Sequence, residues 1–299
     1  MQVRTILCSM VLGSLFLLSS HASADDLWRH KINGTDRTYF LHGFRKDAPL
    51  RPLVIALHGW SGDALDITRY LGMNAVADRE DFLVVYPDGF ARTWNYGVPV
   101  DKSPMPVARN RPLDDVFFLK SMINNLIKKA AADPARVYLT GVSYGGMMAF
   151  AAACALSNEL AAVAPLITGM SEQQRADCSG KPIPLLVIAG TKDTSQTYDG
   201  EFAGPTPLLS VPDTIAFWKQ HNGCSAEAGD ALPHLDPADP TKVNLLRYNG
   251  CTDGAEISFY RIDGGGHQVP SISAPARDGR NRDFEGAEVL WSFFKRFSR

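Results

Sequence analysis

Three residues suited to nucleophilic catalysis each follow an apolar run of the chain. Ser143 lies in the stretch TGVSYGG (140–146), Asp193 follows LLVIA (185–189), and His267 follows a run that ends in DGGG (263–266). A serine hydroxyl is a weak nucleophile near neutral pH and needs a base within hydrogen-bond reach. His267 can supply that base, and Asp193 can hold the imidazole in the required tautomer. We therefore expect Ser143 as nucleophile, His267 as general base and Asp193 as its partner.

The pattern G-x-S-x-G has a physical reason when it joins a strand to a helix. The turn must be tight, and a side chain at either glycine would collide with the neighbouring strand or helix. The alternative is a packing turn without chemistry, which does not explain the positions of Asp193 and His267. Among rival residues, His58 is expected to orient the backbone of its own loop, and Asp199 and Asp213 lie farther from the strand end.

Two backbone N–H groups are expected to bind the charge that develops on the substrate oxygen. One belongs to Tyr144, directly after the serine, and the other to Trp60 in the loop that follows an early strand. The substrate-binding residues are predicted to be Trp60, Trp94, Asn95, Tyr144 and Tyr198. An alternative role for Trp94 and Asn95 is to lock their own loop. No phosphate cradle or metal-ligand spacing is found, so no cofactor and no metal are predicted.

The elements that must position these residues alternate along the chain. Short apolar runs predict strands buried on both faces, and apolar residues at helical spacing predict the helices between them. Such alternation predicts an α/β fold with a mostly parallel central sheet flanked by helices, and ligands at the carboxyl ends of its strands. The predicted strands are 53–57, 83–86, 137–139, 185–189 and 257–262, with an edge strand at 38–41; the predicted helices are 115–132, 144–155, 212–221 and 283–297.

Composition and the first residues set the class and the compartment. The chain has 299 residues, of which 45% are hydrophobic, and a formal net charge of -2. This balance gives no electrostatic reason to bind nucleic acid or an anionic membrane. Residues 1–24 have one basic residue, an apolar core and a small-residue end, which is typical of a secretory signal peptide and too short to span a bilayer. We expect one catalytic domain over 25–299 in a secreted or periplasmic protein; no oligomeric state is predicted.

Export changes the interpretation of the cysteines. Cys8 leaves with the signal peptide, and an even number remains in an oxidising compartment. Of the three pairings open to them, we favour the local one, which joins Cys154 to Cys178 and Cys224 to Cys251. Each bridge would close a loop of about 25 residues, worth roughly 3 kcal/mol in the chain-entropy model. Buried free thiols are the alternative, because the spacings do not suit zinc.

Several stretches together resemble a known family. LHGWSGD, the region from GMNAVADRE to FARTWN, DPARVYLTGVSYGGMMAF, AGTKDTSQTYDG and FYRIDGGGHQVPS are similar to secreted polyhydroxybutyrate depolymerases and to feruloyl and acetylxylan esterases of carbohydrate esterase family one. The resemblance covers about residues 37–271. It implies the α/β-hydrolase fold, a triad on Ser143, Asp193 and His267, and local disulfides. The chain departs from the family at Tyr144, where asparagine or glutamine is common, and at Gln268.

These observations lead to one favoured function and two alternatives. The favoured function is a secreted serine carboxylesterase that acts on a hydroxyalkanoate oligomer or on feruloyl or acetyl esters of plant polysaccharide. Its partner is then an ester substrate, which is a small molecule, an oligomer or a polysaccharide side chain. G-x-S-Y-G-G is also similar to prolyl oligopeptidase-type peptidases, although their usual propeller domain is absent from this chain. The other alternative is a non-catalytic binding protein on a hydrolase scaffold.

Overall fold

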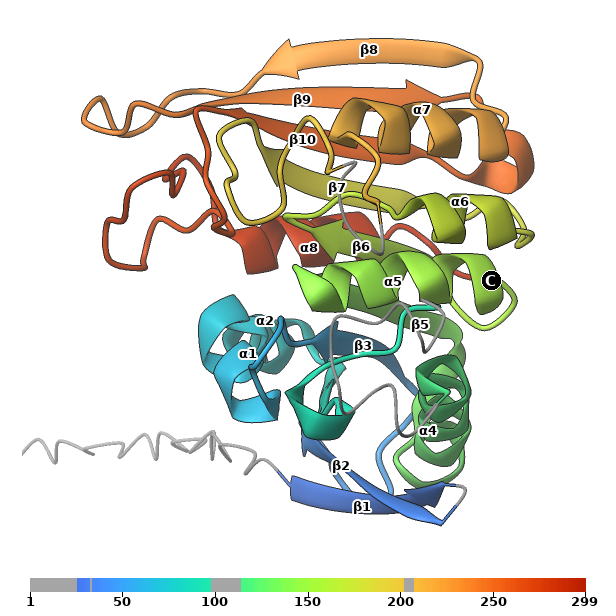
Figure 1. Ribbon diagram of the computed structural model, residues 1–299. Coiled ribbons are helices and arrows are strands. Elements are labelled where there is room, and N and C mark those ends of the chain that lie inside the picture. Colours follow the sequence, from blue (N-terminus) through green and yellow to red (C-terminus); the bar gives the residue numbers. More distant parts are fainter. Residues whose placement is uncertain (1–25, 33, 98–113, 202–206) are drawn as a thin grey trace, which may run out of the picture.

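The computed structural model describes residues 26–32, 34–97, 114–201 and 207–299. The predicted signal peptide, 1–24, lies outside the described residues. Ten strands within these ranges form one sheet in the order β1-β2-β4-β3-β5-β6-β7-β10-β9-β8 (Figure 1). The strands are β1 (Asp26–Ile32), β2 (Thr35–His42), β3 (Arg51–Leu57), β4 (Leu83–Pro87), β5 (Ala132–Val142), β6 (Ala162–Leu166), β7 (Leu185–Gly190), β8 (Ala226–Ala231), β9 (Lys242–Asn249) and β10 (Ile257–Asp263).

The centre of the sheet is parallel and both of its margins are antiparallel. β4, β3, β5, β6, β7 and β10 run parallel to one another. β1 and β2 form an antiparallel pair at one margin, and β9 and β8 do so at the other. The six parallel strands therefore end along one edge, and the loops that follow them meet there.

Helices cover both faces of the sheet, as Figure 1 shows. Apolar residues of α4, α5 and α7 belong to one buried cluster, and those of α1, α2 and α8 belong to the other. The helices are α1 (Ala64–Leu71), α2 (Met73–Glu80), α4 (Asp115–Lys129), α5 (Tyr144–Ala155), α6 (Glu172–Asp177), α7 (Val211–His221) and α8 (Gly286–Phe294), with 3-10 turns η1 (Phe90–Arg92) and η3 (Thr252–Gly254). The predicted fold class, a mostly parallel sheet flanked by helices, is confirmed.

Strand β3 shows why the all-apolar runs become central strands. Its side chains alternate between the two faces, so Leu53, Ile55 and Leu57 enter one cluster while Val54 and Ala56 enter the other. All of these residues are fully buried. A strand with helices on both faces has no solvent side, and an unbroken apolar sequence follows from that position.

The margins of the sheet differ from the sequence prediction. Residues 38–41 were expected to form an edge strand, but β2 pairs with both β1 and β4, so the edge prediction was wrong. Strand β1 takes the edge instead. Strand β6 was not predicted because AVAPL is short, rich in alanine and interrupted by Pro165. β6 is extended because it pairs with β5 on one side and with β7 on the other, although its local sequence has a low strand propensity.

Candidate active site

Ser143 occupies a tight turn between β5 and α5. Its backbone has φ 57° and ψ -115°, which a residue with a side chain rarely adopts. A Cβ at Gly145 would lie 2.5 Å from the carbonyl oxygen of Leu57, and one at Gly141 would lie 2.1 Å from that of Gly145. Both glycines are therefore required by close backbone approach. The turn brings Ser143 to the carboxyl end of the parallel strands, at the first turn of a helix.

Asp193 and His267 are joined by a hydrogen bond between side chains. His267 Nδ1 donates to Asp193 Oδ2 at 2.6 Å, and the two side chains are 26% and 2% exposed, respectively. The other carboxylate oxygen of Asp193 accepts the backbone N–H groups of Ser195 at 2.8 Å and Gln196 at 2.9 Å. Three hydrogen bonds to its two oxygens therefore hold the Asp193 carboxylate in place. With its proton on Nδ1, His267 keeps the Nε2 lone pair for a second partner.

The loops that carry Asp193 and His267 are fixed to one another. They follow β7 and β10, which are parallel neighbours. The Lys192 N–H donates to the Gly265 carbonyl at 2.8 Å, and the Gly264 N–H donates to Thr191 Oγ1 at 2.9 Å. These bonds lie immediately before Asp193 and before His267. The pairing of β7 with β10 and these two hydrogen bonds therefore set the separation of Asp193 and His267.

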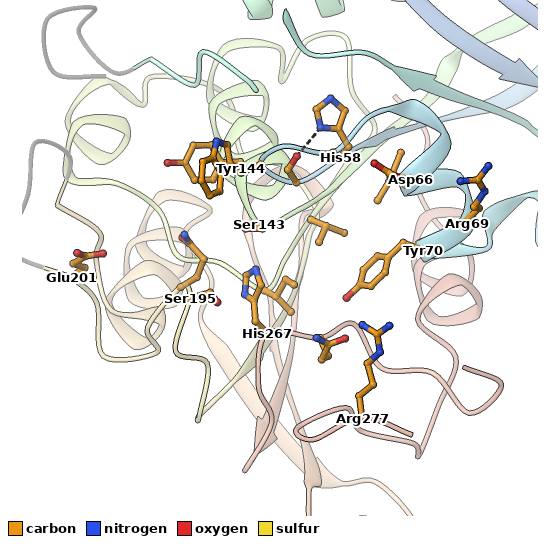
Figure 2. Close-up of a pocket in the computed structure, with 18 residues that line it drawn as sticks. His58, Asp66, Arg69, Tyr70, Ser143, Tyr144, Ser195, Glu201, His267 and Arg277 are labelled. Atoms are coloured by element: carbon orange, nitrogen blue, oxygen red, sulfur yellow. Dashed lines mark hydrogen bonds between the residues drawn. The ribbon is translucent and has the colours of Figure 1, made fainter. Parts of the chain in front are cut away.

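Ser143 and His267 line the same cavity, whose volume is about 900 Å³. Figure 2 shows Ser143 between the His58 loop and His267. The wall also includes Trp60 and Tyr144, which were predicted to contact substrate. The structure thus brings the predicted nucleophile, the predicted base and two predicted substrate contacts into one space. This arrangement can support acyl transfer through a serine.

The side chains of Trp60 and Tyr144, the predicted oxyanion donors, lie next to each other in the wall of the cavity. Their ring centroids are 6.4 Å apart, and Trp60 is 57% exposed. Tyr144 is the first residue of α5, where a backbone N–H has no acceptor within the helix. Burial raises the pKa of the Tyr144 phenol, so this side chain stays neutral at physiological pH. The oxyanion role of the two N–H groups remains a prediction.

Comparison with known proteins places the chain among esterases. It is 29% identical over 262 residues to a Nocardia uniformis subsp. tsuyamanensis protein that carries the name esterase NocK, covering 82% of this chain and 74% of the relative. It is 27% identical to feruloyl esterase B of Piromyces equi, covering 87% of this chain and 44% of the relative. It is 30% identical to poly(3-hydroxyalkanoate) depolymerase C of Paucimonas lemoignei, covering 54% and 39%. The chain thus spans less than half of the last two relatives. No family model matches it.

Comparison with solved structures shows the fold. An acetyl xylan esterase from Aspergillus awamori superposes with a TM-score of 0.61 at 15% sequence identity, covering 90% of this chain and 99% of that one. The chain therefore has the α/β-hydrolase fold. The esterase and depolymerase names of its relatives confirm the predicted class of this hydrolase, which is a carboxylic ester hydrolase.

Both disulfides of the hydrolase have the predicted local pairing. Cys154 is bonded to Cys178, and Cys224 is bonded to Cys251. Cys154 lies in the last turn of α5, the helix that begins after Ser143, and Cys178 follows the end of α6. The first disulfide therefore ties α5, the helix that begins after Ser143, to α6.

His58 holds two loops of the hydrolase together from a buried position. Its Nδ1 bonds to the Gly59 carbonyl at 2.7 Å, and its Nε2 accepts the Gly89 N–H at 2.9 Å. Because a protonated Nε2 could not accept that bond, the observed contacts require a neutral imidazole. Burial lowers the pKa of His58, which favours the same neutral form. The predicted role of His58, orienting the backbone of its loop, agrees with these contacts.

Three predicted substrate contacts lie outside this cavity. Trp94 is 3% exposed, and its indole N–H donates to the His58 carbonyl at 2.9 Å, which supports the alternative role of locking its own loop. The Asn95 N–H donates to Asp115 Oδ2 at 2.7 Å, which also places this residue in the support of the loop. Tyr198 is partly buried against the apolar cluster that contains residues of α4, α5 and α7, and it does not line the cavity.

Sequence reasoning missed a whole wall of the cavity. Asp66, Arg69 and Tyr70 reach it from α1, and Gln268 and Arg277 reach it from the segment after His267. The sequence carried a signal for α1, because Asp63 and Asp66 form a capping box at its start. The sequence does not show that this helix reaches the cavity, because its position depends on how it packs against β3 and β4.

In the described ranges, no group of three or more His, Cys, Asp and Glu side chains is arranged to hold a metal ion. No helix in the same ranges is both long and apolar enough to cross a bilayer.

Proposed function

We propose that this hydrolase cleaves carboxylic esters through an acyl-enzyme on Ser143. One observation carries the proposal: Ser143, at a strained turn, opens onto the same cavity as His267, whose Nδ1 is hydrogen-bonded to Asp193. A strained serine beside an oriented imidazole costs stability, and proteins keep such features where chemistry uses them. A binding protein on this scaffold would have no need for the hydrogen-bonded pair.

The reaction follows in two halves. His267 Nε2 removes the proton of Ser143 as the serine oxygen attacks the ester carbonyl, and it then returns the proton to the departing alcohol oxygen. The N–H groups of Tyr144 and Trp60 bind the negative oxygen of the tetrahedral intermediate, a contact whose loss typically lowers the rate by about 10²–10³. Water then repeats the same steps on the acyl-enzyme, releasing the acid. Asp193 stabilises the imidazolium in both halves.

The substrates are proposed from the cavity and from the names of the relatives. The relatives include a feruloyl esterase and a hydroxyalkanoate depolymerase, so the candidate substrates are feruloyl or acetyl esters of polysaccharide and esters of 3-hydroxybutyrate. A cavity of about 900 Å³ accommodates either an aromatic acyl group or an oligomer of a few residues. The rings of Trp60 and Tyr144 offer an apolar wall to both.

The proposed site of action is outside the cytoplasm. The two disulfides support this location, because such bonds persist in oxidising compartments. Expression of the full chain in a bacterial host, followed by fractionation, tests it directly. Processed enzyme with both disulfides in the periplasm or medium is expected, whereas full-length reduced protein confined to the cytoplasm would contradict export.

A side-by-side substrate panel tests the activity. Purified enzyme and its Ser143→Ala variant are assayed on p-nitrophenyl acetate, methyl ferulate, 3-hydroxybutyrate oligomers and an aminoacyl-proline amide. We expect turnover of esters that is lost in the variant, together with stoichiometric fluorophosphonate labelling of the wild type only. Cleavage of the amide without turnover of any ester would replace this proposal with a peptidase. Absence of both turnover and labelling would leave only a binding role.

A further inference from the structure

The two ends of the cavity differ in chemistry. At one end lie the aromatic rings of Trp60 and Tyr144, and at the other lie Arg69 in the last turn of α1 and Arg277 in the segment after His267. Figure 2 shows Tyr144 on one side of Ser143 and both arginines on the opposite side. A substrate that spans the cavity therefore meets an apolar wall at one end and two guanidinium groups at the other.

Both arginines are available to a ligand. Within the described part of the chain, neither guanidinium forms an ion pair with a carboxylate, whereas many other arginines do, such as Arg79 with Glu288. Asp66 also lines this end, but its carboxylate accepts a hydrogen bond from Arg92 at 3.2 Å and faces a cation already. This end of the cavity thus presents two guanidinium groups that form no ion pair with a carboxylate of the described residues.

The segment that carries Arg277 is built onto the backbone beside His267. The Gly266 N–H donates to the Gly279 carbonyl at 2.9 Å, directly before His267. Arg280, three residues after Arg277, is buried, and its guanidinium donates to the Gln268 side chain at 2.8 Å and to the Pro275 carbonyl at 3.0 Å. Arg277 is therefore held on the His267 side of the cavity by a folded turn.

Helix α1 is tied to the same backbone. The Val269 N–H donates to the Tyr70 hydroxyl at 2.9 Å, two residues after His267. Tyr70 is the neighbour of Arg69, and both line the cavity. Since His267 must deliver its proton to the departing oxygen, the alcohol part of the ester lies on the His267 side. The two arginines consequently face the alcohol part and not the acyl part.

We propose that Arg69 and Arg277 bind a carboxylate on the alcohol part of the substrate. This inference rests on the proposed esterase function and narrows it. In an oligomer of a 3-hydroxy acid, the alcohol released by cleavage of the last ester carries a free carboxylate, which guanidinium groups bind by charge-assisted hydrogen bonds. Neutral acetyl or feruloyl esters of a sugar offer no such group. The substrate class is therefore a hydroxy-acid oligomer with a free carboxyl end, shortened from that end.

A comparison of one substrate in two charge states tests the proposal. The 3-hydroxybutyrate trimer and its methyl ester share the same scissile bonds and differ in the terminal charge. We expect wild-type kcat/KM to favour the free acid over the methyl ester about tenfold or more, mainly through KM. Arg277→Ala and Arg69→Ala are each expected to lower that ratio by about tenfold, and Arg277→Lys by less. The ratio cancels any general loss of activity.

The matched control is Arg247→Ala. Arg247 lies on β9, pairs with Asp230 and does not line the cavity, so the free-acid preference of this variant should equal that of the wild type. Added salt should weaken the wild-type preference, because these arginines are exposed. Equal wild-type rates on the acid and its methyl ester, with p-nitrophenyl acetate still cleaved, would overturn this inference alone. Failure to cleave any ester would overturn the proposed function itself.

Discussion

Replacing Asp193 with asparagine separates its charge from its shape. One oxygen of Asp193 accepts two backbone N–H groups, from Ser195 and Gln196, and the other accepts His267 Nδ1. An asparagine has one acceptor oxygen and one NH₂ group. If the NH₂ group faced the two backbone donors, both of these part-buried bonds would be lost, at about 1 kcal/mol each. The oxygen therefore stays with the backbone, and the NH₂ group faces His267.

That orientation gives His267 the wrong tautomer. With a donor opposite Nδ1, the imidazole must accept there and carry its proton on Nε2, where Ser143 needs a lone pair. The same exchange in a serine protease lowers kcat about 10⁴-fold, which corresponds to about 5 kcal/mol of transition-state stabilisation. We expect a loss of this size for Asp193→Asn, measured as kcat on p-nitrophenyl acetate, and a matching fall in the rate of fluorophosphonate labelling.

The control for this experiment is Asp199→Asn, which changes an exposed aspartate on the same loop. It should keep the wild-type kcat, and both variants should unfold near the wild-type temperature. A folded Asp193→Asn enzyme with more than a tenth of wild-type kcat would refute the role assigned to Asp193. A large loss in Asp199→Asn instead would transfer the role to that residue.

Three further predictions follow from close packing, cross-linking and burial. Gly145→Ala forces the backbones of two elements apart, so we expect urea titration to show about 1–3 kcal/mol of destabilisation and kcat to fall at least tenfold. The control is Gly229→Ala, which should show neither effect, because the atom nearest to the added Cβ is 3.4 Å away. Replacing Cys154 and Cys178 together by serine should lower the free energy of unfolding by about 3 kcal/mol; an unchanged urea midpoint would contradict this. Because burial lowers the pKa of His58, the unfolded chain binds a proton at this residue more readily than the folded chain does. The contribution of neutral His58 to the free energy of unfolding is complete above about pH 6.5 and declines below it, by at most about 1.4 kcal/mol per pH unit. His58→Gln should therefore flatten the dependence of the free energy of unfolding on pH below about 6.5.

The sequence predicted those parts of the fold that depend on local composition. The central strands are unbroken apolar runs, and the residues that follow them in the chain were correctly expected at one edge of the sheet. Strand β8 shows the opposite case, because all of its residues are exposed and AEAGDA has no apolar alternation to detect. It forms because the neighbouring strand β9 offers it an unpaired backbone edge.

The site divides in the same way. Ser143, Asp193 and His267 could be found because each follows a strand whose direction the pattern fixes. The position of the Trp94 ring could not be predicted, because the local sequence is the same whether the ring faces a cavity or the interior. In the structure the ring is buried, and its N–H donates to the His58 carbonyl. The place of Arg69 in the cavity wall could not be predicted, because it depends on how α1 packs against the sheet.

The place of β10 in the sheet also governs when the enzyme can become active during synthesis. β10 is the last strand in the chain, yet it lies between β7 and β9 and is the only connection of the β8–β9 hairpin to the rest of the described sheet. His267 follows it. A chain that is still being synthesised therefore lacks His267 and one margin of the described sheet until β10 and the residues that follow it have been made.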